Sequence, residues 1–485
     1  DYRLFKQSQE EGTDYYSNSF QYLRNLAFFG MATYSYKGRY TINGTLRYEG
    51  SNMLGKSRQA RWLPTWNVSG SWNAHEENWW APTFGKAWTY ASLKASYSLT
   101  ADRGPASNSL AVFQSFTPWR PSTSANESAI ILAALENSEL TYEKKNELNI
   151  GVALGFVDNR INVEFDWYRR NNFDLIGYTQ TMGVGGVTTK LANDATMEST
   201  GCEFTISTTN IKTKDFKWTT DWIFGWAENT ITKLDSRSQV YSLVNGVGRT
   251  EGRPIGALYS IPFAGLTEEG LPTFFIDAEH TQVVGPGNYA DIYFQEYENI
   301  DYLKYEGTID PKITGSFGNT FSWKGLKLNV FFTYSFGNVL RLDNLCPVYS
   351  SDYSDLTASM KEMKNRWMVP GDENVTTIPS IPTVRQMREI DALNNAYSAY
   401  NYSTERVAKG DFIRLKELSL AYDLPKKYFE GQNAVSSFGV KLSATNLWLA
   451  YADKKLNGRD PEYYNTGGVS SPVPRQFTLT VKLGF

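Results

Sequence analysis

Long stretches of this chain alternate apolar and polar residues at every position. The alternation runs through residues 40–48, then 146–156, and it resumes at 161–167 after the segment VDNR. It returns at 216–226, 326–336 and 476–485. A period of two residues predicts β-strands that place one face against an apolar environment, and the short VDNR segment predicts a tight hairpin.

The length of these strands and the pattern of their connections narrow the fold class. The alternating stretches run for roughly ten residues or more, which suits a strand tilted across hydrocarbon, whereas strands of soluble sheets have about five or six residues. Short turns near 37, 158, 212 and 324 alternate with longer connections. The long connections are expected near 101–144, 173–197, 265–310, 339–409 and 450–473. We therefore predict an all-β fold, a transmembrane antiparallel β-barrel with about 13 strands within residues 1–485.

The direction of each predicted strand is set by counting back from the last one, which must end on the short-turn side. The directions agree only if residues 229–312 add an even number of strands to the barrel, or none. The longest apolar run, 129–135, is far shorter than the roughly 20 residues that a membrane-spanning helix needs. The opening residues DYRLFKQ lack a signal-peptide pattern, so either a signal has been removed or the sequence starts in mid-protein.

Composition supports this prediction. The chain has 31 Tyr, 27 Phe and 14 Trp, together 15% of its residues, beside 38 Gly. Aromatic residues suit pleated strands and glycine suits their reversals. Six tryptophans gather at the ends of two predicted strands: Trp62, Trp66, Trp72, Trp79, Trp80 and Trp88. They are either girdle residues at the lipid boundary or ordinary packing residues.

A soluble β-sandwich or propeller is the alternative architecture. A propeller requires a repeat of about 40–50 residues, and the sequence contains none. A sandwich rarely keeps strands of this length with so many aromatic residues at their ends. The barrel is therefore the better interpretation.

The charge pattern and the scarcity of reactive residues exclude several functions. The net charge is −3, from 48 basic and 51 acidic residues that are mixed along the chain, so nucleic acid is not an expected partner. His75, His280, Cys202 and Cys346 lie far apart and make a zinc site improbable. Whether the two cysteines are free or form one disulfide stays open. We expect no enzyme, no cofactor, and no catalytic, cofactor-binding or metal-binding residue.

Acidic pairs and one glycine-rich segment have simple structural interpretations. Glu76 with Glu77, and Asp215 with Asp221, are expected in solvated turns or on a polar lumen face. GVGG at 183–186 lacks the lysine that a phosphate-binding loop requires and is expected in an outer loop.

Several segments resemble the SusC/RagA family of TonB-dependent outer-membrane transporters. These are RWMVPGDENVTTIP at 366–379, STERVAKGDFIRLKELSLAYDLPKKY at 403–428, SATNLWLA, LNGRDPE and the terminal strand, together with residues 34–73. The resemblance covers nearly the whole chain and is most specific from 403 to 485. Residues 285–315 depart from the family's aspartate-rich pattern, so no cation site is carried over.

The resemblance implies a 22-stranded barrel with a plug domain in the outer membrane of a Bacteroidetes-type Gram-negative bacterium. This chain is then expected to be the C-terminal part of the barrel, with the plug and the first strands outside it. The implied function is active import of nutrients, oligosaccharides or peptides, as the SusC-like component of a SusCD-type transporter. The alternative is a SusC-like barrel that serves as a structural scaffold in an outer-membrane assembly or secretion complex.

The partners implied are a SusD-like surface lipoprotein, the TonB system acting through the plug, outer-membrane lipids, and a second SusCD pair in a dimer. Residues that contact substrate or partner stay unassigned. Exposed loop tyrosines are expected to pack against the lipoprotein or to stack on sugar rings: Tyr349, Tyr353, Tyr397, Tyr400 and Tyr402. In the terminal strand, Phe477, Leu479, Val481, Leu483 and Phe485 are expected to face lipid.

The expectation of a partial barrel is directly testable. The native polypeptide should be much longer than 485 residues, because an open sheet has unpaired edges that lipid does not tolerate. Immunoblotting of native outer membranes measures its length. A native polypeptide no longer than this sequence would contradict the expectation.

Overall fold

The computed structural model describes residues 2–3, 6, 22–85, 87–105, 109–116, 129–183, 186–345, 361–425, 436–464 and 474–484. In this part of the chain strands predominate and the helices are short. None of the described helices combines the length and the apolar character that crossing a bilayer requires.

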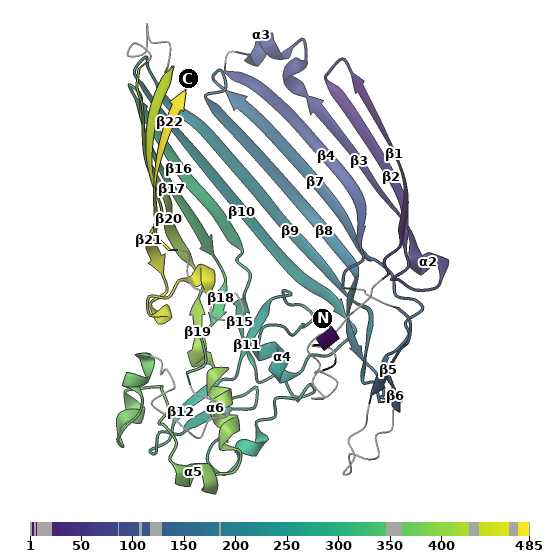
Figure 1. Cartoon of the computed structure of the whole chain (residues 1–485), viewed down its shortest axis with the longest axis vertical. Helices are drawn as coiled ribbons and strands as arrows, with labels where there is room; N and C mark the ends of the chain where they lie inside the picture. The colour runs from purple at the N-terminus through teal and green to yellow at the C-terminus, as the bar shows by residue number, and fades with distance from the viewer. Residues whose placement is uncertain are drawn as a thin grey trace.

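Thirteen strands form one antiparallel sheet in which each strand pairs with its neighbour in chain order (Figure 1). Its strands are β1 (Asn25–Tyr36), β2 (Tyr40–Ser51), β3 (Trp62–Asn73), β4 (Trp88–Asp102), β7 (Glu143–Phe156), β8 (Ile161–Gln180), β9 (Thr189–Lys212), β10 (Phe216–Leu234), β16 (Ile313–Trp323), β17 (Leu326–Phe336), β20 (Phe412–Asp423), β21 (Ser437–Ala452) and β22 (Gln476–Gly484). The sheet is strongly curved but not closed, and β1 and β22 are its edges. The number agrees with the expected count of about 13 barrel strands.

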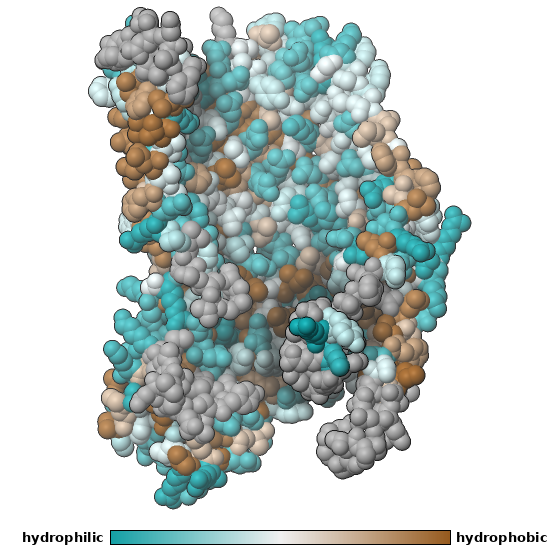
Figure 2. All heavy atoms as spheres, in the orientation of Figure 1, coloured by the Kyte–Doolittle hydropathy of each residue, from teal (hydrophilic) through white to brown (hydrophobic). Residues whose placement is uncertain are grey.

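The register places apolar residues in rows on the outer face and polar residues in rows on the inner face. One outer row crosses five strands as Leu93, Val152, Phe165, Phe204 and Phe224. The adjacent inner row consists of Lys94, Gly151, Asp166, Glu203 and Gly225. In Figure 2 hydrophilic residues occupy much of the hollow that the sheet encloses, and hydrophobic residues gather along the outer flank at the left. The two faces therefore suit two different solvents, as a membrane barrel requires.

The outer apolar zone covers only part of the longest strands. On β8, outward residues are apolar as far as Trp167, and the next ones are Arg169 and Asn171. Arg169 is exposed and forms an ion pair with Glu198 of β9. Strands β8 and β9 have 20 and 24 residues, about twice the 9–11 that span hydrocarbon. Their polar halves therefore extend beyond the apolar zone.

Short turns lie at one end of the sheet and long connections at the other, as the sequence predicts (Figure 1). Between β16 and β17 the turn consists of Lys324 and Gly325, whose φ angles are 44° and 92°. Two consecutive positive φ angles are typical of a type I′ hairpin, and glycine adopts them without steric cost. Residues between β10 and β16 add no strand to the main sheet, which satisfies the expected even number or none.

The short helices and the small sheets lie in the connections. The helices are α2 (Arg58–Arg61), α3 (Trp80–Phe84), α4 (Val240–Val244), α5 (Val384–Glu389) and α6 (Leu393–Asn401), and the 3₁₀ turns are η1 (Ala74–Glu76), η2 (Tyr289–Asp291), η3 (Lys361–Asn365), η4 (Asp372–Asn374), η5 (Thr404–Arg406), η7 (Lys454–Leu456) and η8 (Pro461–Tyr463). Four small sheets pair β5 (Val112–Phe116) with β6 (Ala129–Ala134), β11 (Ala257–Ser260) with β15 (Lys304–Thr308), β12 (Phe263–Leu266) with β13 (Pro272–Phe275) and β14 (Val283–Val284), and β18 (Val339–Arg341) with β19 (Val407–Lys409).

Two of the long connections fold together into one compact unit, which we call the loop lobe: residues 235–312, 338–345 and 361–411. Its apolar core contains Phe274 and Tyr289 from the first connection and Tyr400 from the second, all fully buried. The Tyr289 hydroxyl donates to the carbonyl of Pro272 over 2.8 Å. Ile261 and Ser403 form a parallel bridge between the connections. This lobe holds the largest apolar core of the described residues.

One predicted connection is shorter than expected. The long loop predicted at 173–197 is mostly strand, because β8 continues to Gln180 and β9 begins at Thr189. The prediction was wrong because the outward residues of β8 are no longer apolar after Trp167, so the alternating pattern ends there. Pairing between β8 and β9 nevertheless continues to Gln180 and Thr189. The other long connections, including 265–310, carry short strands or turns of their own.

The aromatic residues that the sequence singled out divide between packing and exposure. Trp80 is buried at the short-turn end, where its ring lies 4.9 Å from that of Trp88 and its Nε1 donates to the Trp88 carbonyl. It is therefore a packing residue. In the terminal strand the expected outward set is exposed at Phe477, Leu479, Val481 and Leu483. Phe485 lies outside the described residues.

The two faces of β8 yield a stability prediction for the complete protein in lipid vesicles. Phe165→Arg on the outer face should lower the free energy of unfolding by about 2–4 kcal/mol, because it places a charge in hydrocarbon. Glu164→Arg, one residue away on the inner face, should change it by less than about 1 kcal/mol. Urea titration of vesicle-bound protein measures both values. Equal effects of the two substitutions would contradict this assignment of faces.

Candidate functional site

The inner wall of the sheet carries charged side chains that hold one another in place. Glu147 on β7 forms ion pairs with Arg170 and Lys145, each at 2.9 Å. The guanidinium of Arg170 also lies 3.9 Å from the ring centre of Tyr168, a cation–π distance. Hydrated solutes can contact such a wall without losing hydrogen bonds. Chemically it suits passage and binding of polar molecules.

A buried ion pair joins the sheet to the last long connection. Arg414 on β20 is 4% exposed and pairs with Asp460, and its Nε lies 3.1 Å from Glu462 Oε2. Asp460 directly precedes η8 and caps it by accepting from the backbone N–H of Glu462, which lies within the turn. Arg414 lies in the FIRLKELSL segment and Asp460 in LNGRDPE. Two of the segments that carry the family resemblance therefore meet in space.

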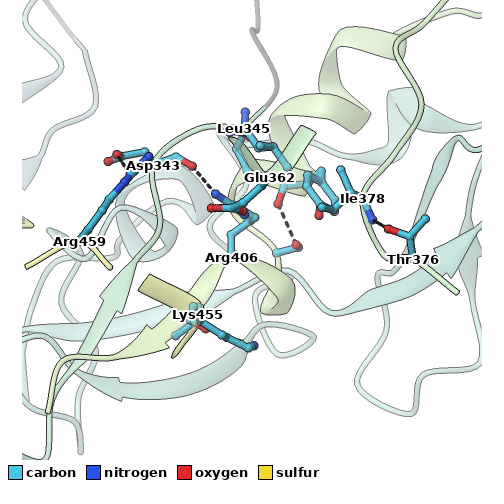
Figure 3. A network of polar contacts seen from close by, with 12 residues as sticks. Asp343, Leu345, Glu362, Thr376, Ile378, Arg406, Lys455 and Arg459 are labelled. Carbon is cyan, nitrogen blue, oxygen red and sulfur yellow. Dashed lines mark hydrogen bonds and ion pairs between the residues drawn. The ribbon is translucent and has the colours of Figure 1, made fainter. Parts of the chain in front are cut away.

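A second buried arginine organises the loop lobe (Figure 3). Arg406 is 4% exposed, and it binds the Glu362 carboxylate over 2.5 Å and the Asp343 carbonyl over 2.7 Å. The Asp343 carboxylate in turn pairs with Arg459. Residues from two long connections, the one between β17 and β20 and the one between β21 and β22, thus share one polar network.

Arg341 on β18 ties the two connections of the lobe together. Its guanidinium donates to the Ser403 carbonyl over 2.9 Å, and to the carbonyls of Val244 and Tyr259 on the other connection. Burial lowers the pKa of Arg341 to about 10. The side chain therefore stays cationic at neutral pH and needs all of these acceptors. These contacts hold the two connections of the lobe together.

The loop tyrosines expected to be exposed are not. Tyr397 and Tyr400 on α6 are 3% and 1% exposed. The Tyr397 hydroxyl donates to the Ser380 carbonyl, and the ring of Tyr400 lies 5.7 Å from that of Phe263. Tyr402 is half-buried beside Tyr241 and Phe294. The assignment of Tyr397 and Tyr400 to partner or sugar contact was wrong, because apolar residues distant in sequence cover them. Tyr349 and Tyr353 lie outside the described residues.

Among the acidic residues singled out earlier, Glu77 is an organising residue rather than a solvated one. It accepts hydrogen bonds from the Tyr40 hydroxyl over 2.5 Å and from Arg39 over 3.2 Å. It therefore holds the first hairpin against the connection between β3 and β4. In the described residues no group of three or more His, Cys, Asp or Glu side chains could hold a metal ion. Cys202 is a free thiol, and Cys346 lies outside the described residues.

Comparison with known proteins supports the resemblance seen in the sequence. The TonB-dependent receptor P3 of Formosa agariphila is 26% identical over 487 residues, which cover 94% of this chain and 45% of that protein. The TonB-dependent receptor SusC of Bacteroides thetaiotaomicron is 27% identical over 214 residues, covering 43% of this chain and 21% of SusC. No family model matches. The resemblance to SusC-like TonB-dependent receptors is thus confirmed, and the chain spans about half the length of the P3 receptor.

Solved structures show the same fold. The RagAB peptide transporter matches with a TM-score of 0.72 and 22% identity, over 96% of this chain and 47% of that one. The RagAB peptide importer in its open-open state gives a TM-score of 0.73 over 96% and 47%. The names of these relatives are those of receptors and transporters.

The buried ion pair at Arg414 gives a local-stability prediction. Arg414→Met leaves the Asp460 carboxylate buried without its cation, so residues 453–464 should be destabilised by about 3–5 kcal/mol. Lys416→Met is the control, because Lys416 contacts Glu462 at 3.5 Å from a more exposed position, and an exposed pair contributes about 0–1 kcal/mol. Hydrogen exchange of residues 453–464 measures both. Unchanged exchange in the Arg414 variant would show that the pair does not hold this connection.

Proposed function

We propose that this chain forms part of an outer-membrane transporter that imports nutrients as the SusC-like component of a two-protein system. The observation that carries the proposal is the sheet itself: its outer face is apolar, its inner face is polar and charged, and a folded lobe stands at its long-connection end. These features fit a wall between lipid and a hydrated passage. The sequence similarity to TonB-dependent receptors supports the same function.

We further propose that additional strands and a plug complete the barrel. Strands β1 and β22 each lack a partner on one side among the described residues. Unpaired backbone groups cost several kcal/mol each in hydrocarbon. The alignment with this chain covers 45% of the P3 receptor, so that receptor is about twice as long as the part that aligns. A barrel of 22 strands, with a plug that the TonB system acts on, accounts for both observations.

In this proposal the long connections and the loop lobe face the cell exterior, where a SusD-like lipoprotein covers them. The proposed cargo is an oligosaccharide or a peptide, and the related RagAB protein is described as a peptide transporter. The chain's polar residues bind and guide the cargo and carry out no reaction on it, so we propose no enzymatic activity. The proposed location is the outer membrane of a Bacteroidetes-type bacterium, with two transporter–lipoprotein pairs forming a dimer.

Deletion of the gene provides the test. The deletion strain should lose uptake of one class of labelled oligosaccharide or peptide, and the intact gene should restore it. Removal of TonB should abolish the same uptake in the wild-type strain, because import needs energy from the inner membrane. Unimpaired uptake across both classes, together with purification in a large multiprotein assembly, would instead support the scaffold function.

Affinity purification from native membranes tests the proposed partner separately. One surface lipoprotein should co-purify in about equal amount with the transporter. Arg406→Met removes the cation that pairs with Glu362 in the lobe, and it should reduce co-purification of the lipoprotein. Lys233→Met, on β10 outside the lobe, should leave co-purification unchanged. Docking on the lobe would be contradicted if the lipoprotein co-purified normally with both variants. An equal loss of co-purification in both variants would also contradict it.

A further inference from the structure

A cavity of about 530 Å³ lies between the projecting ends of β8 and β9 and the segment that leads into α4. We call it the rim pocket. Its polar lining includes Tyr178, Asp194, Arg237, Ser238, Gln239 and Arg249. Cavities that bind small molecules usually have about 300–1,000 Å³. The rim pocket therefore has room for one or two sugar rings or a few amino-acid residues.

Arg237 and Arg249 bring positive charge to the rim pocket. In the described part of the chain, neither Arg237 nor Arg249 uses its side chain in an ion pair or hydrogen bond. The backbone of Arg249 is nevertheless fixed, because its N–H donates to Ser238 Oγ over 2.8 Å and its carbonyl accepts from the same hydroxyl. The buried arginines of the lobe and of β20 differ, since all three have carboxylate or carbonyl partners.

The floor of the rim pocket contains a buried carboxylate that is only half satisfied. Asp194 on β9 is 2% exposed. Its Oδ2 accepts from Ser236 Oγ over 2.7 Å, whereas its Oδ1 has no hydrogen-bond partner among the described residues. An unsatisfied buried carboxylate oxygen is costly in a protein interior. The Asp194 carboxylate and the two arginines give the rim pocket charges of both signs.

Gly177 keeps space open between these charges. A Cβ atom at this position would lie 3.1 Å from Asp194 Oδ2 and 3.2 Å from Arg249 Nη1. Gly177 pairs with Ala192 in a regular strand and its φ is not positive. The backbone therefore does not require glycine here, and the advantage of glycine is the space it leaves.

We propose that the rim pocket binds a carboxylate group of the imported solute. Arg249 and Arg237 contact the carboxylate oxygens, since guanidinium groups bind carboxylates through paired, charge-assisted hydrogen bonds. A neighbouring hydroxyl or amide N–H of the solute faces the serines of the pocket. Tyr178, which is 73% exposed at the mouth, offers a ring face to the rest of the molecule.

This inference rests on the proposed import function and specifies its substrate class as acidic. Two sources supply the same chemistry: a saccharide that contains uronic acid, and a peptide with its free C-terminal carboxylate. A neutral oligosaccharide lacks the group that both arginines require. Binding should weaken as salt concentration rises, because the contacts are between full charges.

Calorimetry on the complete detergent-solubilised protein tests the proposal. The probes are trigalacturonate against neutral maltotriose, and trialanine against trialanine amide. We expect one acidic probe to bind at least tenfold more tightly than its neutral counterpart. Arg249→Gln should weaken that binding at least tenfold, and Gly177→Val should abolish it by filling the space. Lys233→Gln, an exposed charge on β10, is the matched control and should have little effect.

The outcome identifies the source of the carboxylate. Preference for trigalacturonate identifies an acidic saccharide, and preference for trialanine identifies a peptide. Equal binding of acidic and neutral probes, or binding that Arg249→Gln and Gly177→Val leave intact in folded protein, would overturn the proposal. Because calorimetry needs no TonB, binding that persists without cellular uptake would count against import alone. Uptake of a purely neutral nutrient without acidic binding would count against the rim pocket alone.

Discussion

Lateral hydrogen bonding between strands is the constraint on which the rest of this structure depends. Hydrocarbon offers no water to backbone N–H and C=O groups, so a strand is stable there only between two partners. Every strand from β2 to β21 in the main sheet has both. Fixed pairing places alternate side chains on opposite faces, which separates apolar rows from polar ones. Irregular backbone is excluded from the apolar zone, so the long connections, and with them the lobe and the rim pocket, lie beyond it.

The sequence predicts those parts of the fold that depend on local pattern. Alternation identifies the strands, and the Lys324–Gly325 turn follows from its glycine. The lobe is not predictable in this way, since Tyr400 is buried by Phe263, a residue far away in the chain. The Arg414–Asp460 pair is similar: both residues lie in segments that resemble known transporters, but no periodicity shows that they touch. The extensions of β8 and β9 were missed because strands in water need no apolar face.

Arginine serves two different purposes at the rim. Arg341 and Arg406 are enclosed by acceptors, and their hydrogen bonds hold segments of irregular backbone in a single arrangement. The backbone of Arg249 is also fixed by hydrogen bonds, but its guanidinium has no partner in the part of the chain that the structure describes. A rigid frame that presents an unoccupied cation reduces the ordering cost of binding, because little of the protein must be immobilised when a ligand arrives.

The division of the loop lobe between two connections has a consequence for biogenesis. The apolar residues of the first connection, Phe274 and Tyr289 among them, share one core with α6 of the second connection. The hairpin of β16 and β17 lies between the two in sequence, so its pairing brings the halves together and shortens the loop that must close. A strand pair inserted out of register would leave both halves uncovered. Burial of the apolar core of the lobe therefore depends on correct register in the β16–β17 hairpin of the main sheet.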